Sequence, residues 1–307
     1  MKQLSFRTKY NIAIYSFTIP AIVLFILFVI VPLFRGVFLS FTNWNGYSQK
    51  YKIVGIDNYI RLFTDKNVMR ATFNTLVYGI GSTLLQNILG LLFALYLNSK
   101  FKGRTVVRTC IYLPVMIASL IMGYIMYFFF TYDGAFNDIR LALGMEALDF
   151  LAEGKRAVVI LTLVNSWQFV GISMVLYLAG LQGISDMYYE AAMIDGATGY
   201  TLFSKITFPL LAPAINSAVV INLIGGLKLF DVIKALTNGG PGYDSNSLST
   251  LINRTYFGSE AAGYAAAIGI CSFLLIAIIS SFATRYLNKY QEERSWSFKK
   301  LIIYGNI

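Results

Sequence analysis

Residues 157–185 read AVVILTLVNSWQFVGISMVLYLAGLQGIS and contain no Asp, Glu, Lys or Arg. A helix rises about 1.5 Å per residue and needs about 20 apolar residues to cross the hydrocarbon core of a bilayer. The apolar residues of this stretch are continuous, whereas those of a membrane β-barrel strand alternate with polar ones. The stretch is therefore predicted to be a transmembrane helix.

Five further stretches of similar length also lack charged side chains. Together the six predict an all-α membrane protein, a single transmembrane domain of residues 1–307 with six spans. The predicted spans cover residues 11–34, 72–98, 109–131, 158–181, 206–227 and 262–284. The longer connections are a loop at 185–205 on one side of the membrane and loops at 35–70, 133–156 and 228–260 on the other.

Composition supports a membrane protein and excludes several other classes. Of 307 residues, 57% are hydrophobic and 13% are charged, against about 45–50% and 25% in soluble domains. The net charge of +10 is read as basic residues gathered at the cytoplasmic ends of spans, so nucleic acid is not an expected partner. The sequence has no histidine, which removes the commonest ligand of zinc and haem, and no metal site is predicted.

Basic residues near the ends of the spans predict the orientation. Residues 1–9 carry three bases and no acid, and residues 100–108 carry four bases and no acid. Both termini are therefore expected in the cytoplasm. The loop at 185–205 would lie on the same side, yet it has three acids and one base. This departure from the charge rule indicates that the loop has a role beyond topology.

The loop begins SDMYYEAAMIDGATG at Ser185. Ser185 is a suitable N-cap, and Gly196 ends a helix readily because it adopts the left-handed conformation. Thr198 is expected to cap a second short helix that leads towards Ile206 and the fifth span. From this pattern alone, the element is either a plain interfacial helix pair or a docking element for another protein.

One motif in this loop resembles a known signature. EAAMIDG is followed after nine residues by ITFP, which resembles the pattern of permease subunits of binding-protein-dependent ABC transporters. The matching residues are Glu190, Ala191, Ala192, Gly196, Ile206 and Pro209, with Phe208 where the family usually has Leu. The segments FDVIKALTNGGPGYDS at 230–245 and NTLV at 74–77 are similar to permeases of the maltose and multiple-sugar type.

The resemblance implies a type I ABC importer permease fold with a cytoplasmic coupling helix between helices 4 and 5. That helix would dock in a groove of a separate ATPase subunit, where Glu190 would pair with a basic residue. The residues implied in ATPase coupling are Tyr188, Glu190, Ala191, Ala192, Asp195, Gly196, Phe203 and Pro209.

The chain is expected to be a transport subunit and not an enzyme. It has no phosphate-binding GxxxxGK[ST] motif, since the nearest approach at 199–205 lacks the second glycine. No cofactor is expected on this chain, and ATP and Mg²⁺ would be bound by the partner. The resemblance implies a multi-pass protein of the bacterial cell membrane. Its partners would be a second permease in a heterodimer, two ATPase subunits, an external solute-binding protein, membrane lipid and a carbohydrate.

The spans contain no ionisable Asp, Glu, Lys or Arg, which suits a neutral solute better than an ion-coupled carrier. Each polar side chain in a span could instead contact a neighbouring helix. Asn216 and Asn222 are six residues apart, so at least one of them is expected to be structural. Pro209 and Pro213 are expected to bend the fifth segment. The candidate solute contacts are Tyr124, Tyr127, Asn165, Trp167, Gln168, Ser173, Asn216 and Asn222.

Glycine and proline cluster in the outer loop before the sixth span. The cluster is either a plain chain reversal or, by the resemblance, a contact surface for the solute-binding protein. The candidate contacts are Asn238, Gly239, Gly240, Pro241 and Tyr243. Two other functions stay open from the residues alone. One is a facilitator or channel that needs no ATPase. The other is a membrane enzyme, although the acids of 133–156 show no catalytic spacing.

Overall fold

The computed structural model describes residues 6–304, with side chains for residues 15, 16, 18–289 and 291. Within that part the chain is almost entirely helical, and an isolated antiparallel bridge joins Thr42 to Ile53. The chain divides into two compact units. One comprises Met1–Thr64 with Ile252–Cys271, and the other comprises Asp65–Leu251 with Ser272–Ile307. The basic side chains of residues 1–9, which support the predicted orientation, lie outside the described side chains.

The first unit begins with a long helical stretch. It consists of α1 (Phe6–Phe25), a π-helical turn (Ile26–Ile30) and α2 (Val31–Ser40), and a short helix α3 (Asp57–Thr64) follows. Residues 18–40 are long and apolar enough to cross a membrane, and none of the side chains in their most apolar window is buried. This candidate span ends six residues later than the predicted span 11–34.

The loop between α2 and α3 is held by hydrogen bonds inside the first unit. Asn58 donates to the carbonyls of Ser40 and Thr42, both at 2.8 Å. The amide of Gly263 donates to the carbonyl of Trp44 at 2.8 Å. A Cβ at Gly263 would lie 2.0 Å from the Thr42 carbonyl oxygen, so only glycine allows this approach of the two backbones.

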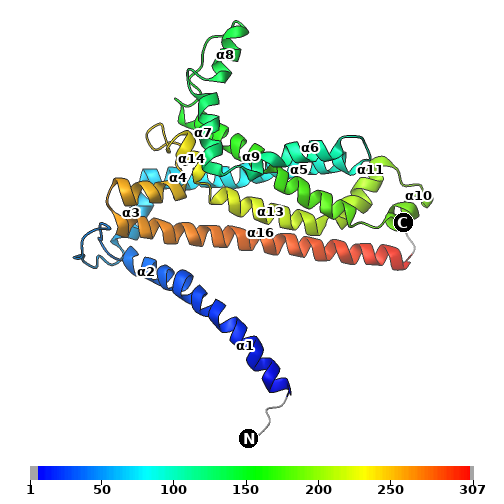
Figure 1. Ribbon diagram of the computed structural model, residues 1–307, viewed down its shortest axis with the longest axis horizontal. Coiled ribbons are helices and arrows are strands. Elements are labelled where there is room, and N and C mark those ends of the chain that lie inside the picture. Colours follow the sequence, from blue (N-terminus) through cyan, green and yellow to red (C-terminus); the bar gives the residue numbers. More distant parts are fainter. Residues whose placement is uncertain (1–5, 305–307) are drawn as a thin grey trace. The chain divides into compact units, whose positions relative to one another are not determined.

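The centre of the second unit is α9 (Gly154–Gln182), of whose most apolar window 67% is buried. Beside it runs the helical stretch formed by α4 (Lys66–Leu76), a π-helical turn (Val77–Gly81) and α5 (Ser82–Asn98) (Figure 1). The two helices approach closely at Gly90, where a Cβ would lie 2.4 Å from that of Ser173. Because small residues let backbones approach, the pair forms a tightly packed core.

The third predicted span, 109–131, is divided in the structure. The helix α6 (Arg104–Tyr112) with a 3-10 turn (Leu113–Met116) precedes α7 (Ser119–Phe130), and the two parts are bent by 100°. Pro114 lies in the 3-10 turn, and Ile117 after it has an extended backbone. The carbonyl of Ile117 accepts a hydrogen bond of 3.0 Å from the buried Gln168. A side chain of the neighbouring helix thus satisfies a backbone group at the break.

The fifth predicted span, 206–227, is also bent. A helical stretch composed of α11 (Gly199–Leu202), a π-helical turn (Phe203–Thr207) and α12 (Phe208–Leu210) meets α13 (Ala212–Leu227) at 65°. Pro213 lies in the first turn of α13 and Pro209 in α12. The bend expected from these two prolines is present, because proline removes a backbone donor and clashes with the preceding turn.

The remaining helices include the long α16, whose residues up to Cys271 belong to the first unit and whose residues from Ser272 belong to the second. They are α8 (Ala135–Ala142), α10 (Asp186–Ile194), α14 (Asp231–Leu236), α15 (Leu248–Asn253) and α16 (Ala262–Tyr304), with a π-helical turn (Arg254–Gly258) after α15. The acidic loop 133–156 contains the short helix α8. Its α8 is held by Asn137, which donates to the carbonyls of Tyr132 and Leu148 and accepts from the Leu148 amide.

In the described part, four helices are long and apolar enough to span a membrane, and the number rises to six if each bent pair is one span. The predicted spans 72–98, 158–181 and 262–284 fall inside three of the four. The protein is therefore an all-helical chain with four to six candidate spans.

Candidate functional site

The helix predicted in the loop 185–205 is present as α10. The hydroxyl of Ser185 accepts a hydrogen bond of 3.4 Å from the Met187 amide, and the first turn carries Asp186. The helix ends at Ile194, and Gly196, two residues later, has φ +81°. The amide of Ala197 donates back to the Ala192 carbonyl at 2.9 Å. Both ends follow from local sequence, since an N-cap acceptor and a left-handed glycine satisfy the free backbone groups of a short helix.

One face of α10 contacts its own chain. Ala192 is 1% exposed. One turn earlier on the same face, the hydroxyl of Tyr189 lies 3.2 Å from that of Thr207 in the π-helical turn after α11. Tyr189 was absent from the predicted site residues, although its three-residue spacing from Ala192 places the two side by side. These two residues attach α10 to the segment that leads into α13.

The other face of α10 is exposed. Met187 is 67% and Ile194 87% exposed, and Glu190 and Ala191 between them are exposed too. Glu190 makes no ion pair with any described residue. The result is an apolar strip beside an unpaired carboxylate. This exposed strip is the candidate contact surface of α10 for another molecule.

The other predicted coupling residues differ in exposure. Asp195 and Gly196 are exposed at the end of α10, whereas Tyr188, Phe203 and Pro209 are half-buried. The ring of Phe203 lies 6.0 Å from that of Phe208, centroid to centroid. Thr198 precedes α11 as expected, but its side chain makes no capping hydrogen bond. The predicted set thus divides into an exposed surface and a packed base.

A pocket of about 200 Å³ lies among α5, α9 and α13. Most of its exposed lining is apolar, and it is called here the polar pocket because three amide side chains reach it. Two predicted solute contacts, Asn165 and Asn222, line it together with Gln86, which was not predicted. The Gln86 amide nitrogen donates to the Asn165 carbonyl at 3.1 Å, while its buried Oε1 has no hydrogen-bond partner. The sequence signal that could have identified Gln86 was a glutamine within an uncharged span. Burying its amide oxygen without a hydrogen-bond partner costs free energy, so such a residue points to a ligand or a structural role. The rest of the lining includes Ser119, Phe169, Lys228, Phe230 and Asp231.

Two other predicted solute contacts serve as ties between helices. Asn216 donates to Gln291 on α16 at 2.6 Å. Ser173 is buried and accepts a hydrogen bond of 2.5 Å from Asn222. Asn216 therefore fits the expectation that at least one of the two asparagines is structural.

The remaining predicted solute contacts lie outside the pocket lining. Gln168 is buried, and its side-chain amide donates a hydrogen bond to the Ile117 carbonyl. Tyr124, Tyr127 and Trp167 are between 42% and 53% exposed on the surface of the isolated chain. These aromatic side chains are therefore open to lipid or to another subunit.

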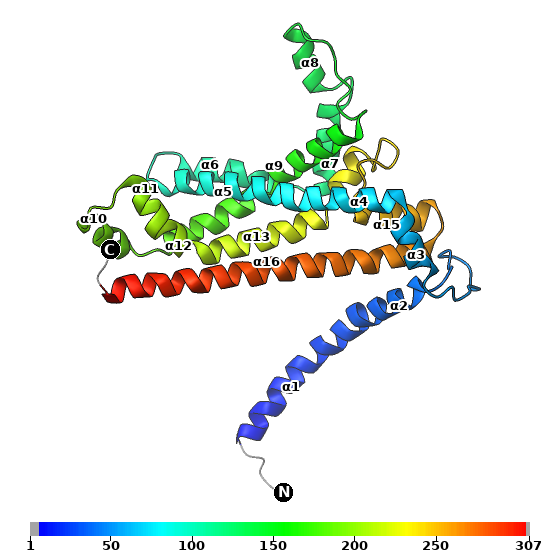
Figure 2. The same ribbon diagram turned by 180° about the vertical axis from the view of Figure 1, so that it is seen from behind.

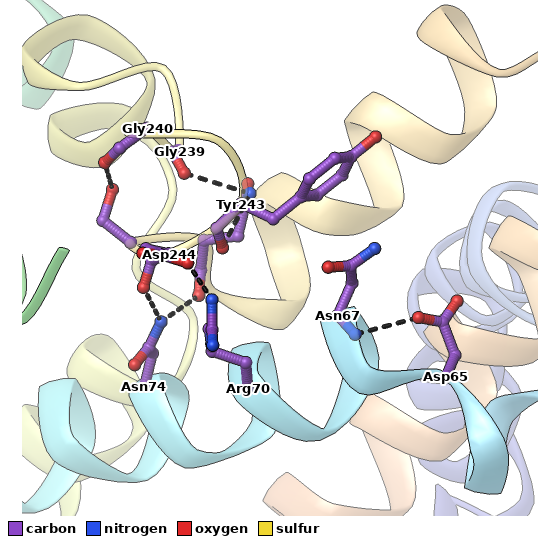
Figure 3. A network of polar contacts seen from close by, with 10 residues as sticks. Asp65, Asn67, Arg70, Asn74, Gly239, Gly240, Tyr243 and Asp244 are labelled. Atoms are coloured by element: carbon purple, nitrogen blue, oxygen red, sulfur yellow. Dashed lines mark hydrogen bonds and ion pairs between the residues drawn. The ribbon is translucent and has the colours of Figure 1, made fainter.

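The loop at 238–246, before α15, is held to α4 by hydrogen bonds and an ion pair (Figure 3). Asn74 donates to the carbonyls of Asp244 at 2.7 Å and Asn246 at 3.0 Å. Arg70, one turn earlier, forms an ion pair with the Asp244 carboxylate. The hydroxyl of Tyr78, one turn later, donates to the Ser245 carbonyl at 2.8 Å. The NTLV and NGGPGYDS segments, far apart in sequence, thus form one structural unit.

Within this loop the predicted contact residues differ in exposure. Asn238 is exposed, and the ring of Tyr243 points away from the polar network, as Figure 3 shows. Gly240 and Pro241 are half-buried. Gly239 is buried with φ +81°, and a Cβ there would lie 2.2 Å from Asn246 Oδ1. Gly239 therefore maintains the shape of the loop, while Asn238 is exposed and Tyr243 is half-buried.

Comparison with known proteins places these features in context. Residues 86–291 match the family model described as "binding-protein-dependent transport system inner membrane component". The chain is 35% identical to the multiple sugar-binding transport system permease protein MsmF of Streptococcus mutans, over 90% of this chain and 96% of that protein. It is 33% identical to the trehalose/maltose transport system permease protein MalF of Thermococcus litoralis, over 89% and 92%.

Solved structures agree with the sequence relatives. A chain of a bacterial ABC transporter involved in the import of the acidic polysaccharide alginate has a TM-score of 0.79 and 28% identity, covering 92% of this chain and 96% of that one. A chain of the MetNI methionine ABC transporter, at 17% identity, has a TM-score of 0.54 and covers 76% and 98%. This second likeness concerns the fold alone.

Proposed function

Because the chain belongs to the family of binding-protein-dependent transport system inner membrane components, we propose that it is one of two permease subunits of an ATP-driven importer for a sugar or oligosaccharide. The subunits of this family are permeases and not enzymes. In the proposed assembly the chain pairs with a second, similar but distinct permease. Two ATPase subunits bind ATP and Mg²⁺ on the cytoplasmic side.

The observation that carries the proposal is the exposed face of α10. Tyr189 and Ala192 hold the helix to the segment that continues into α13, while Met187, Ala191 and Ile194 are left uncovered. We propose that this face docks in the ATPase groove and that Glu190 pairs with a basic residue there. Since α10 is joined to a transmembrane helix through a short segment, a movement of the ATPases moves the bundle.

The polar pocket supports a carbohydrate as the transported solute. Gln86, Asn165 and Asn222 supply amide groups, and Phe169 and Phe230 supply aromatic surface. Sugar hydroxyls need hydrogen-bond partners, and the CH faces of a sugar pack on aromatic rings. We propose that the solute passes this pocket as the assembly alternates between outward-open and inward-open states.

The proposed placement in the bilayer counts each bent pair as one span, which gives six spans. Both termini and α10 then lie in the cytoplasm, and the loop at 238–246 lies outside. In this arrangement Asn238 and Tyr243 contact the solute-binding protein.

Reconstitution tests the proposal. The genes adjacent to this one would supply the second permease, the ATPase and the binding protein. We expect sugar uptake into proteoliposomes only when all components and ATP are present. Uptake by the purified chain alone, or uptake independent of ATP, would identify a self-contained facilitator and contradict the proposal.

A further inference from the structure

The short helix α3, between the first two predicted spans, has three faces of different character. Residues three or four apart on a helix share a face. One face of α3 contacts the protein, a second is apolar and exposed, and a third is polar and exposed. The attached face carries Asn58, Tyr59 and Leu62, the apolar face carries Ile56, Ile60 and Phe63, and the polar face carries Asp57, Arg61 and Thr64.

Contacts of α3 place it where two candidate spans end. The hydroxyl of Tyr59 lies 2.6 Å from that of Ser40, the last residue of α2. The Cζ atom of Arg61 lies 4.1 Å from the ring centroid of Tyr264, in the first turn of α16. One candidate span ends with α2 and another begins with α16. The helix α3 is therefore at the level where both of these segments leave the hydrocarbon core.

The axis of α3 runs across the first turns of α16 and not along them, as Figures 1 and 2 show. Because a transmembrane helix runs through the bilayer, a helix that crosses its end lies along the membrane surface. A helix in that position is stable when it has an apolar side for the lipid and a polar side for the water. The two exposed faces of α3 meet this requirement.

The contacts of the attached face show which exposed face is turned towards the bilayer. By spacings of three and four residues, Tyr59 borders the apolar face and Asn58 borders the polar face. The Tyr59 hydroxyl reaches Ser40 inside α2. Asn58 donates to the Ser40 carbonyl and also to that of Thr42, beyond the end of α2. The apolar face is therefore on the side of the span, and the polar face is on the side away from it.

The apolar face continues the exposed surface of the neighbouring span. Ile56 is 61%, Ile60 56% and Phe63 75% exposed. In the last two turns of α2, Phe34 is 68% and Phe38 48% exposed. No side chain in the most apolar window of that candidate span is buried. The exposed apolar surface of α3 thus joins a surface that lipid can cover.

Aromatic side chains gather at the same level. The ring of Tyr51 lies 6.3 Å from that of Phe38, and the ring of Tyr59 lies 5.4 Å from that of Phe41. Tyrosine is enriched among the lipid headgroups, because its ring is apolar and its hydroxyl is polar. A water-soluble partner would have to enter the headgroup region to cover the apolar face of α3. Its position therefore favours lipid over a soluble protein.

We propose that α3 is an interfacial membrane anchor. Ile56, Ile60 and Phe63 insert into the upper acyl region of the leaflet in which α2 ends, and Asp57 and Arg61 stay in the water. This contact fixes the depth of the first span. The proposal concerns a lipid surface in general and no particular headgroup. It goes beyond the proposed function, since it needs neither a transported solute nor a choice of membrane side.

Fluorescence quenching tests the proposal on the full chain in nanodiscs. In a C110S/C271S background, Ile60→Cys would carry a bimane label, and Asp57→Cys on the polar face is the matched control. Both positions are exposed, so neither label enters the core. The quenchers are a phospholipid with a spin label near the top of its acyl chain and, separately, aqueous iodide.

We expect lipid quenching of the Ile60→Cys label to exceed that of the Asp57→Cys label about threefold or more, since the apolar face of an interfacial helix is buried about 5–10 Å. Iodide quenching should show the opposite order. Phe63→Cys, on the same face as Ile60, should behave like Ile60→Cys. Agreement of the two apolar positions makes a local effect of one label an insufficient explanation.

Equal lipid quenching at Ile60→Cys and Asp57→Cys would overturn the proposal, as would free access of iodide to Ile60→Cys. The measurement would be repeated after assembly with the second permease. Loss of lipid quenching at Ile60→Cys on assembly would identify a subunit contact and also overturn the proposal, whereas unchanged quenching would support it. The measurement on the chain alone needs neither ATPase nor solute, so its failure is distinct from a failure of the proposed transport function.

Discussion

The side-chain amide of Asn74 donates a hydrogen bond of 2.7 Å to the backbone carbonyl of Asp244, 170 residues further along the chain. The Asp244 side chain in turn lies against Gly154, the first residue of α9, where a Cβ would come within 2.3 Å of it. Asp244 thus joins the last turn of α4 to the start of the central helix α9. The loop at 238–246 is therefore a structural part of the bundle as well as a partly exposed surface.

Replacement of Asn74 by Leu should loosen the outer loop. The variant loses both hydrogen bonds of the Asn74 amide and leaves two loop carbonyls without this donor, which should cost about 1–3 kcal/mol. Thermal unfolding in detergent and protease cleavage within 238–246 would measure the effect. Asn67→Leu is the matched control, because its side chain makes no hydrogen bond in the network of Figure 3. Equal stability of the two variants would contradict the role of Asn74.

Two glycines of the same loop should respond differently to alanine. Gly239 has φ +81° with Asn246 directly behind it, whereas Gly242 has φ +58° and open space. Gly242→Ala should cost only the left-handed backbone, about 1–2 kcal/mol. Gly239→Ala should cost more, because it must also displace Asn246. The unfolding temperatures of the two variants would measure this difference in stability. If Gly242→Ala were the more damaging, the packing account would be wrong.

Neighbouring alanines on α10 should separate attachment from docking. Ala192→Leu places a large side chain in a buried site and should destabilise the chain by about 1–3 kcal/mol. Ala191→Leu adds the same side chain to the exposed face, so stability should stay near wild type while ATPase binding falls. Thermal stability and co-purification of the ATPase would be compared. A stable Ala192→Leu variant would show that α10 is not held through this residue.

Charge reversal at Glu190 should abolish coupled uptake without affecting membrane insertion. Glu190→Lys places a cation where the proposal requires an ion pair with a basic ATPase residue, and like charges in an interface are strongly unfavourable. Glu146→Lys, at an exposed residue of the outer loop, is the control and should transport normally. ATP-driven uptake and the amount of membrane-inserted protein would be measured. Normal coupling in Glu190→Lys would refute the docking role.

The two buried glutamines should differ in their effect on transport. Gln86 and Gln168 each donate one hydrogen bond to a carbonyl and each have a buried Oε1 without a partner. Gln86 lines the polar pocket, whereas Gln168 is absent from its lining. Gln86→Leu should therefore raise the KM for uptake about tenfold, as expected for one lost hydrogen bond to a bound solute.

Gln168→Leu should leave that KM unchanged, whereas the stability of this variant should fall as much or more because the Ile117 carbonyl loses its donor. The KM of uptake and the unfolding temperature of both variants would be measured together. An unchanged KM in Gln86→Leu would remove this residue from the solute path.

Local sequence was sufficient to predict the structural features that depend only on residues close together in the chain. The long uncharged runs predicted where helices would lie, because crossing a bilayer requires continuous apolar length. Ser185 and Gly196 predicted the ends of α10, since caps act within one turn. The two prolines predicted the bend before α13 for the same reason. The 100° break between α6 and α7 was missed, because it depends on Gln168 from another helix to satisfy the Ile117 carbonyl.

The sequence by itself determined that this chain is a helical membrane protein of the permease family type, with a short helix after the predicted fourth span. Tertiary structure alone decided which residues of that helix are free, which polar side chains share a pocket and which loop is tied to α4. Ala191 and Ala192 are adjacent and chemically identical, yet one is exposed and the other is buried. Burial and long-range hydrogen bonding depend on what packs from elsewhere in the chain, and a residue's neighbours in sequence do not specify that.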